Sequence, residues 1–376
     1  MNRFSVVIAG GGVAALEALL RLRRLVGDRV HVTLLAPNED FAYRALSVGE
    51  PFSLRAPERH ALRPLIDHAD AEWVQDTLHS VELDRRVLHT GDDQELPFDA
   101  LLVAVGARAL PVVKHATTFD DARADELFRG VVQDIEQGYV KKIAFVNPPG
   151  PVWPLPLYEL ALMTASSGHD AGWDDLELDL ITAEPQPLPA FGAQVGAAVH
   201  ELLVEAGIRV HLSTEPEVPA QGRLTLPLEG IELAVDRIVG LPRLTGPSIG
   251  GIPGCGRHGF VSIDRHCTVP GTAHRVFAAG DAIDFPLKQG GVGAQAADVA
   301  AAAIALASGA KVGVPPFHPV VHGKLLTGAG PKFLFARYVG GQGFDSVIAD
   351  QPTMGSSRKV PTAELAPYLE HATTGV

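Results

Sequence analysis

An apolar strand that runs straight into a glycine turn constrains this chain more than any other feature. Residues 4–9 (FSVVIA) are apolar except for Ser5, as a buried parallel strand requires. A helix is predicted over 13–26, with Gly27 as its stop, and a second strand over 30–35. The turn between them fits G-x-G-x-x-A and consists of Gly10, Gly11, Gly12, Val13, Ala14 and Ala15.

This turn predicts a dinucleotide site rather than a bare glycine turn, because it lies between a buried strand and a helix in one βαβ unit. Gly10 permits the tight turn, Gly12 lets the backbone approach a pyrophosphate, and Ala15 lets the helix pack closely. The acid that commonly ends the second strand and binds ribose is missing, since position 36 is alanine. Glu39 and Asp40 could replace it, or they could be solvated loop acids.

A similar pattern recurs in the middle of the chain. Strands are predicted over 142–146 and 178–182 and helices over 157–166 and 194–206, with a later strand over 275–279 and helix over 294–308. The fold class is therefore α/β, with two doubly wound, Rossmann-like domains and a small C-terminal unit. We predict a first domain over 1–110 and 247–312, an inserted second domain over 111–246, and the C-terminal unit over 313–376.

Composition limits the partners. The 376 residues are 46% hydrophobic and carry a formal net charge of −13, which argues against nucleic acid and a polybasic membrane anchor. No stretch reaches the ~20 apolar residues of a membrane span. The proline-rich tail cannot form a long amphipathic helix, which disfavours stable membrane insertion. We expect a cytoplasmic, soluble protein that acts on a small-molecule substrate, with a homodimer left open.

Three stretches in order resemble the FAD-dependent pyridine nucleotide–disulfide oxidoreductase superfamily. They are the opening glycine turn, residues 99–108 (DALLVAVGAR) and residues 276–291 (VFAAGDAIDFPLKQGG). The branch most resembled is that of type II NADH dehydrogenases and sulfide:quinone oxidoreductases, and the resemblance runs to about residue 307. It implies bound FAD and an oxidoreductase activity.

The resemblance also assigns cofactor contacts. Asp281 would bind the ribityl chain, although it could equally cap a helix. Residues 288–291 would begin a helix whose N–H groups face the flavin N1–C2=O edge, where reduced flavin is negative. The expected cofactor residues are Gly10, Gly11, Gly12, Val13, Ala14, Ala15, Ala36, Arg44, Ala104, Val105, Gly106, Gly280, Asp281, Lys288, Gly290 and Gly291.

The chain departs from this superfamily in its cysteines. Disulfide reductases carry a redox pair after the second strand, where this chain has residues 41–46 (FAYRAL). Its two cysteines, Cys255 and Cys267, fit neither a CxxC pair nor a zinc knuckle. His318 and His322 are interrupted by Pro319, so no metal site is predicted. The expected mechanism is independent of cysteine.

The second domain departs in its glycine loop. Residues 147–156 (NPPGPVWPLP) replace G-x-G-x-x-G, and prolines lack the N–H groups that a pyrophosphate needs, so NAD(P)H binding is doubtful. Residues 154–159 resemble a loop of sulfide:quinone oxidoreductases. Glu184 lies where a ribose acid would, or is an ordinary loop acid. Tyr158, Glu159 and Lys288 are the catalytic candidates, with Glu159 as a proton shuttle.

The predicted function is an FAD-dependent oxidoreductase that passes electrons between a small-molecule donor and an acceptor. The alternatives are a flavin-bearing binding or partner subunit without turnover of its own, and an atypical NAD(P)H:acceptor reductase.

Overall fold

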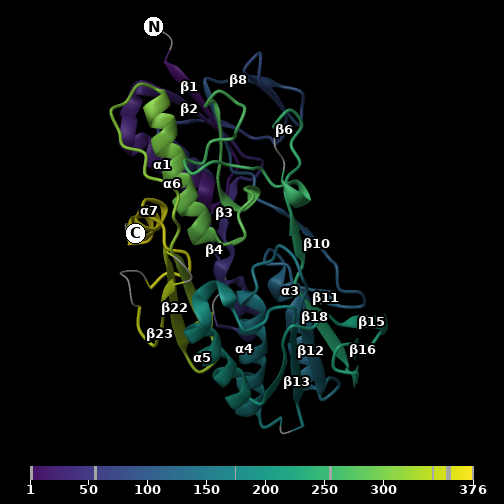
Figure 1. Ribbon diagram of the computed structural model, residues 1–376. Helices are drawn as coiled ribbons and strands as arrows, with labels where there is room; N and C mark the ends of the chain where they lie inside the picture. The colour runs from purple at the N-terminus through teal and green to yellow at the C-terminus, as the bar shows by residue number, and fades with distance from the viewer. Residues whose placement is uncertain are drawn as a thin grey trace.

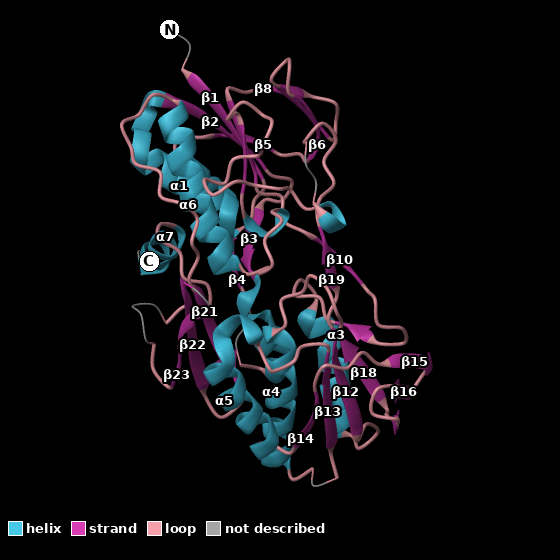
Figure 2. Ribbon diagram, viewed as in Figure 1, coloured by secondary structure: helices cyan, strands magenta, loops and turns pink. Residues whose placement is uncertain are grey.

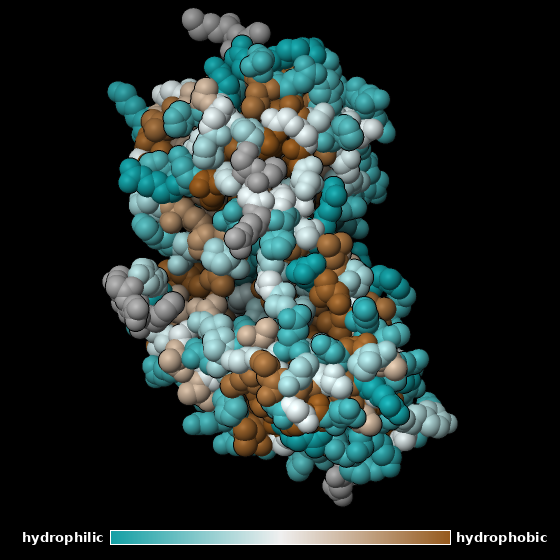
Figure 3. Space-filling view, turned by 45° about the vertical axis from the view of Figure 1, so that its right-hand side comes forward, coloured by the Kyte–Doolittle hydropathy of each residue, from teal (hydrophilic) through white to brown (hydrophobic). Residues whose placement is uncertain are grey.

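Two five-stranded parallel sheets frame the protein in a computed structural model, which describes residues 3–54, 57–173, 175–253, 256–340, 343–352 and 357–374. The strand orders are β20-β9-β1-β2-β5 and β11-β18-β12-β13-β14. Each sheet lies in its own lobe (Figure 1), and the molecule narrows between them (Figure 3). The predicted α/β fold with two doubly wound sheets is confirmed.

The first sheet draws its strands from both halves of the chain. They are β1 (Phe4–Ala9), β2 (Val30–Leu35), β5 (Glu72–Val74), β9 (Ala100–Val103) and β20 (Val276–Ala278). Helix α1 (Val13–Val26) buries Leu16, Leu19 and Leu22 against the sheet. The bounds of β1, α1 and β2 coincide with those predicted, because apolar runs and glycines mark both ends of each.

Helix α6 (Gly290–Ala307) packs beside α1 (Figure 2). It is the one helix in the described ranges that is long and apolar enough to cross a membrane by length and composition. However, 67% of it is buried inside the protein, as in the core helix of a domain. Its composition therefore reflects packing against α1.

The second sheet comes from one continuous part of the chain. Its strands are β11 (Thr117–Thr118), β12 (Lys142–Asn147), β13 (Glu177–Thr182), β14 (Ile208–His211) and β18 (Arg237–Gly240), accompanied by α3 (Ala124–Glu136), α4 (Leu155–Ala171) and α5 (Gly192–Glu205). Two antiparallel strands, β10 (Arg108–Leu110) and β19 (Arg243–Thr245), connect the lobes. The remaining elements are β3 (Asp40–Tyr43), β4 (Glu58–Ala61), α2 (Leu62–His68), β6 (Leu78–Glu82), β7 (Val87–Thr90), β8 (Glu95–Pro97), β15 (Glu217–Ala220), β16 (Arg223–Leu226) and β17 (Ile231–Ala234).

The C-terminal unit bridges the two lobes. Its antiparallel sheet, β21 (Val321–Leu326), β22 (Pro331–Gly340) and β23 (Gly343–Ala349), packs on α4 and α5 of the second lobe (Figure 2). Helix α7 (Leu365–Thr374) packs on α1 of the first lobe. The sequence predicted a small unit here but not its strands.

A buried carboxylate of α1 fastens α7. Both Glu17 carboxylate oxygens accept hydrogen bonds from backbone N–H groups at the start of α7. The donor–acceptor distances are 2.6 Å for Ala363, 2.9 Å for Glu364 and 2.7 Å for Leu365. An anion is favourable there because these first N–H groups lack helical partners. Arg21 and Arg24 of α1 pair with Glu364. The first helix of the chain therefore caps its last.

Candidate functional site

The glycine turn after β1 meets the end of β9 without space for a side chain. A Cβ on Gly10 would lie 2.2 Å from the Ala104 carbonyl oxygen, and Gly10 has φ +130°. A Cβ on Gly11 would lie 3.1 Å from the Cβ of Ala36. The ends of three neighbouring strands are thus brought together, and with them four predicted cofactor residues.

Gly12 and Gly106 are different, because a Cβ on either would meet no protein atom within 4 Å. Gly12 is the N-cap of α1 and provides no capping side chain for the first N–H groups of that helix. Val105, beside Gly106, is 37% exposed although it is apolar. This open space beside a helix N-terminus has the chemistry of a pyrophosphate cradle.

The turn after β20 joins the same site. A Cβ on Gly280, which has φ +73°, would lie 3.0 Å from the Cβ of Ala14. A Cβ on Gly293 of α6 would lie 2.9 Å from the Gly280 Cα. Next in the chain, burial raises the pKa of Asp281 to about 6, while nearby Lys288 opposes the rise. Its carboxylate accepts no hydrogen bond from a described residue and can receive one from a ligand hydroxyl.

Lys288 is buried behind this turn. Its Nζ donates to the backbone carbonyl of Ile283 and, over 3.4 Å, to that of Asp281, and it lies 3.4 Å from the centre of the Phe260 ring. Burial lowers the pKa of Lys288 to about 8. The structure therefore places this catalytic and cofactor candidate where it holds the Asp281 turn in position.

Arg44 begins the 3-10 helix after β3 (Arg44–Phe52). Its guanidinium forms an ion pair with Asp121 of the second lobe, at an N–O distance of 3.4 Å. The Asp121 side chain is 50% exposed, and its partial loss of water raises its pKa while the Arg44 guanidinium opposes the rise. Asp121 is near enough to raise the pKa of Asp281. Arg44, Asp121 and Asp281 therefore group where the two lobes meet.

The start of α6 is covered by the C-terminal unit. A Cβ on Gly290 would lie 3.0 Å from Val360, and one on Gly291 would lie 3.5 Å from Pro361. The Gln289 side chain accepts from the Val292 N–H over 3.0 Å, so part of the helix N-terminus is capped internally. None of the site residues predicted from the sequence lies in the segment around Val360 and Pro361 that reaches this end of α6.

Glu159 on α4 forms a buried ion pair with Lys359 of that segment. The Lys359 Nζ donates to both Glu159 carboxylate oxygens, at 2.7 and 2.6 Å. The Leu326 N–H donates to Glu159 Oε1 at 3.0 Å. The exposed fraction is 0% for the Glu159 side chain and 6% for that of Lys359. Burial raises the pKa of Glu159 and lowers that of Lys359, and their mutual attraction opposes both shifts. Lys359 lies 200 residues from Glu159 in sequence, so no local sequence pattern predicted this ion pair.

Tyr158, the neighbour of Glu159, faces another group. Its hydroxyl donates to Glu184 over 2.8 Å, and Glu184 also accepts from the Asn147 amide over 3.1 Å and from the Thr182 hydroxyl over 3.3 Å. Burial, followed by the Glu184 charge, raises the pKa of Tyr158 well above its usual value. The acid at the ribose position of the second sheet is thus hydrogen-bonded within the protein.

The end of β2 shows what stands in place of a ribose acid. Ala36 is buried, and its carbonyl accepts from the Trp73 indole over 3.0 Å. Glu39 and Asp40 follow on the exposed connection to β3. Burial raises the pKa of Cys267 to about 12, whereas Cys255 lies outside the described residues. No group of three or more potential metal ligands occurs in the described ranges.

The residues at the first sheet fit FAD. Gly12 and Gly106 leave open space beside an uncapped helix, and Asp281 offers a carboxylate with no described donor. FAD needs backbone donors for its pyrophosphate and an acceptor for its hydroxyls. Gly10, Gly12, Ala15, Ala104 and Asp281 would hold it.

Comparison with known proteins identifies the fold. No family model matches the chain. The sulfide:quinone oxidoreductase of Aquifex aeolicus is similar over 99% of this chain and 90% of its own, with a TM-score of 0.80 and 19% identity. A ferredoxin reductase of Rhodopseudomonas palustris is similar over 92% of this chain and 88% of its own, with a TM-score of 0.68 and 18% identity. A NAD-dependent persulfide reductase of A. fulgidus is similar over 99% of this chain and 76% of its own, with a TM-score of 0.66 and 17% identity. As its three sequence stretches predicted, the chain has the fold of the FAD-dependent pyridine nucleotide–disulfide oxidoreductases.

Proposed function

We propose that the chain is an FAD-dependent oxidoreductase that passes electrons from a small-molecule donor to an acceptor. The observation that carries the proposal is the open cradle at Gly12, built by the contacts of Gly10 with Ala104 and of Ala14 with Gly280. FAD supplies the electron transfer when bound, and the protein orients and tunes it. Asp281 would accept a hydrogen bond from a ribityl hydroxyl, and Lys288 holds the turn that carries Asp281.

Glu159 and Lys359 are proposed as the proton reserve of the site. Their ion pair lies beside the segment that covers the start of α6, where the resemblance places the flavin N1–C2=O edge. Burial lowers the pKa of Lys359, so its Nζ releases a proton more readily than an exposed lysine does. Glu159 fixes the position of that Nζ through both carboxylate oxygens.

NAD(P)H is proposed to be a poor donor. The loop after β12 carries prolines at 148, 149, 151, 154 and 156, which have no N–H for phosphates. Glu184 already accepts hydrogen bonds from Tyr158, Asn147 and Thr182. A dinucleotide would have to displace these contacts to use that acid. The proposed mechanism also leaves out cysteine, because burial keeps the Cys267 thiol protonated at neutral pH.

The test is anaerobic stopped-flow reduction of the purified, FAD-loaded protein by NADH, NADPH, sulfide and thiols. We expect bound FAD, released non-covalently on denaturation, and slow reduction by either nicotinamide. Release of FMN, or of no flavin, contradicts the proposal. Fast reduction by NADH or NADPH favours the atypical reductase, and Glu184→Ala should then weaken binding of that donor.

The proline loop and the Tyr158–Glu184 hydrogen bond also favour a second candidate, a flavin-bearing partner subunit without turnover. Rapid bleaching of the flavin by any donor, followed by reoxidation with an acceptor, decides against it. We further propose that the protein acts in the cytoplasm, without stable membrane insertion, on a small molecule rather than on nucleic acid.

A further inference from the structure

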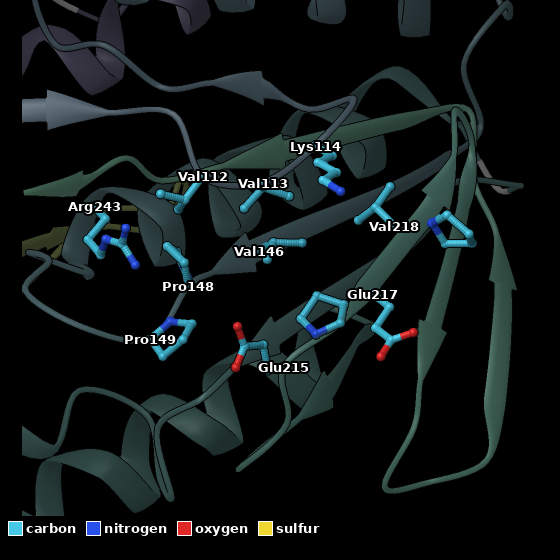
Figure 4. Close-up of a pocket in the computed structure, with 12 residues that line it drawn as sticks. Val112, Val113, Lys114, Val146, Pro148, Pro149, Glu215, Glu217, Val218 and Arg243 are labelled. Atoms are coloured by element: carbon cyan, nitrogen blue, oxygen red, sulfur yellow. The ribbon is translucent and has the colours of Figure 1, made fainter.

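A cavity of about 540 Å³ lies in the second domain, at the carboxyl end of β12. Small-molecule sites commonly have volumes of about 300–1,000 Å³. Three separate segments line this one, which is partly open to solvent: the linker after β10, the proline loop after β12 and the strand β15, with β19 contributing Arg243 (Figure 4). It is a different site from the glycine turn of the first domain.

The walls of this pocket are apolar. They consist of valine and proline side chains, namely Val112, Val113, Val146, Pro148, Pro149 and Val218 among others. Proline offers no backbone N–H, so the loop after β12 provides a surface for contact rather than donors. An occupant therefore needs an apolar body that packs against these side chains.

Four charged side chains surround the walls. Lys114 and Arg243 lie along one side of the pocket, and Glu215 and Glu217 lie on the other (Figure 4). Across the described ranges, none of the four forms an ion pair with another residue. The Arg243 Nε is buried without a hydrogen-bond partner. The four charges therefore have no ion-pair partner among the described residues and remain for a ligand of the pocket to pair.

Gly150 is what lets Arg243 reach the pocket. A Cβ at Gly150, which has φ +109°, would lie 3.0 Å from the Arg243 Cδ. The glycine in the proline loop therefore makes room for an arginine side chain, in a place where a nucleotide loop would make room for a phosphate.

We propose that this pocket binds a small zwitterion with an unbranched apolar body, of the amino-acid class. Arg243 and Lys114 would hold its carboxylate, and Glu215 and Glu217 its ammonium group. Two cations and two carboxylates give the lining no net charge, which suits a ligand without net charge. A dinucleotide is disfavoured, because the proline loop offers its phosphates too few backbone N–H groups. The proposal does not depend on the flavin chemistry.

The experiment is calorimetric titration of the FAD-loaded full chain with four probes: L-norleucine, hexanoate, pentylamine and ADP-ribose. Hexanoate and pentylamine each keep the apolar body and one of the two charges. We expect L-norleucine to bind at least about tenfold more tightly than either, because each charged hydrogen bond adds affinity. Absence of norleucine binding, or equal binding of hexanoate, overturns the proposal. Tighter binding of ADP-ribose that Arg243→Met abolishes would identify a nucleotide site instead.

Variants assign the charges. Arg243→Met and Glu215→Gln should each weaken norleucine binding about tenfold or more. Arg223→Met on β16 and Glu232→Gln on β17 change the same charges on the neighbouring strands, outside the pocket lining, and should leave it unchanged. Val218→Trp should block the cavity without altering any charge. FAD content measured on every variant separates failure of this site from failure of the flavin site, and norleucine binding that survives both Arg243→Met and Val218→Trp contradicts the assignment.

Discussion

The two parallel sheets each have five strands around a central one, β1 or β12, yet the loops after these central strands have opposite chemistry. After β1, glycines 10–12 leave backbone N–H groups open at the start of α1. After β12, prolines remove such groups, and Pro156 stands in the first turn of α4. The sheets need only apolar strands, whereas ligand choice depends on the loop. The same fold therefore supports a dinucleotide cradle in one lobe and a different pocket in the other.

Gly12→Val should produce the largest effect on FAD binding, because its side chain would fill the space of the first loop. We expect FAD affinity to fall at least about 100-fold. The fold should survive, since a Cβ there meets no protein atom within 4 Å. Flavin absorbance per protein and far-UV circular dichroism measure the two effects. Gly313→Val, at another open glycine, is the control, and a fully yellow Gly12→Val protein would contradict the cradle.

Lys359→Met tests the buried ion pair that Glu159 forms near the start of α4. The change leaves the Glu159 carboxylate buried without its partner, and the free energy of unfolding should fall by about 3–5 kcal/mol. Adding Glu159→Gln should recover most of that loss, because a neutral amide is cheaper to bury. Urea unfolding of both single variants and the double variant measures the coupling. Simple additivity of the two changes would show that the pair does not act as a unit.

Asp281→Asn sharpens the account of the first site. Burial raises the pKa of Asp281 to about 6, so the carboxylate that accepts ligand hydroxyls is lost as pH falls through 6. FAD binding should weaken below that pH, and the asparagine variant should bind about tenfold more weakly at pH 8, with a flat profile. Fluorescence titration with FAD from pH 5 to pH 8 tests this. Asp284→Asn, exposed in the same loop, should keep the wild-type profile.

Asp298→Asn should have a smaller effect on stability than Lys359→Met. Asp298 on α6 is 26% exposed, and burial together with Glu17 raises its pKa to about 7. A raised folded pKa stabilises the protein at acidic pH, and that stabilisation is lost as pH rises from about 4 through 7. Removing the charge should therefore raise stability by about 1–2 kcal/mol at pH 8, after allowance for solvent. Thermal unfolding at pH 5 and 8 measures it, with exposed Asp28→Asn as control.

Sequence predicts an element well where one signal marks each end. α1 begins after Gly12 and ends before Gly27, as expected. α4 extends to residues 155–171 rather than 157–166, because proline is tolerated in a first helical turn. α6 begins at Gly290, within the start at 288–291 that the resemblance implies and before the 294 expected from the apolar pattern, and the Gln289 side chain caps it. The strands of the C-terminal unit were missed although they pair with near neighbours in sequence, because glycines and prolines between short aromatic runs obscure the strand pattern.

The candidate site likewise has a part that the sequence predicts and a part that it does not. The contact of Gly10 with Ala104 follows from motif order, because neighbouring strands bring these positions to one edge. The roles of Tyr158 and Lys359 do not, because each depends on an acid that only the folded chain brings near. A pattern of residue types therefore locates the cofactor loop but not the partners of its buried charges.

The cap that Glu17 places on α7 has a consequence for synthesis. The second sheet lies within residues 117–240 and is complete before the chain has emerged in full. The first sheet waits for β20, and the Glu17 carboxylate of its first helix waits for the N–H groups of residues 363–365 that donate to it. Domains form as their segments leave the ribosome. The N-terminal lobe is therefore finished last, and a chain that stops short of α7 leaves a carboxylate of its first helix without its partners.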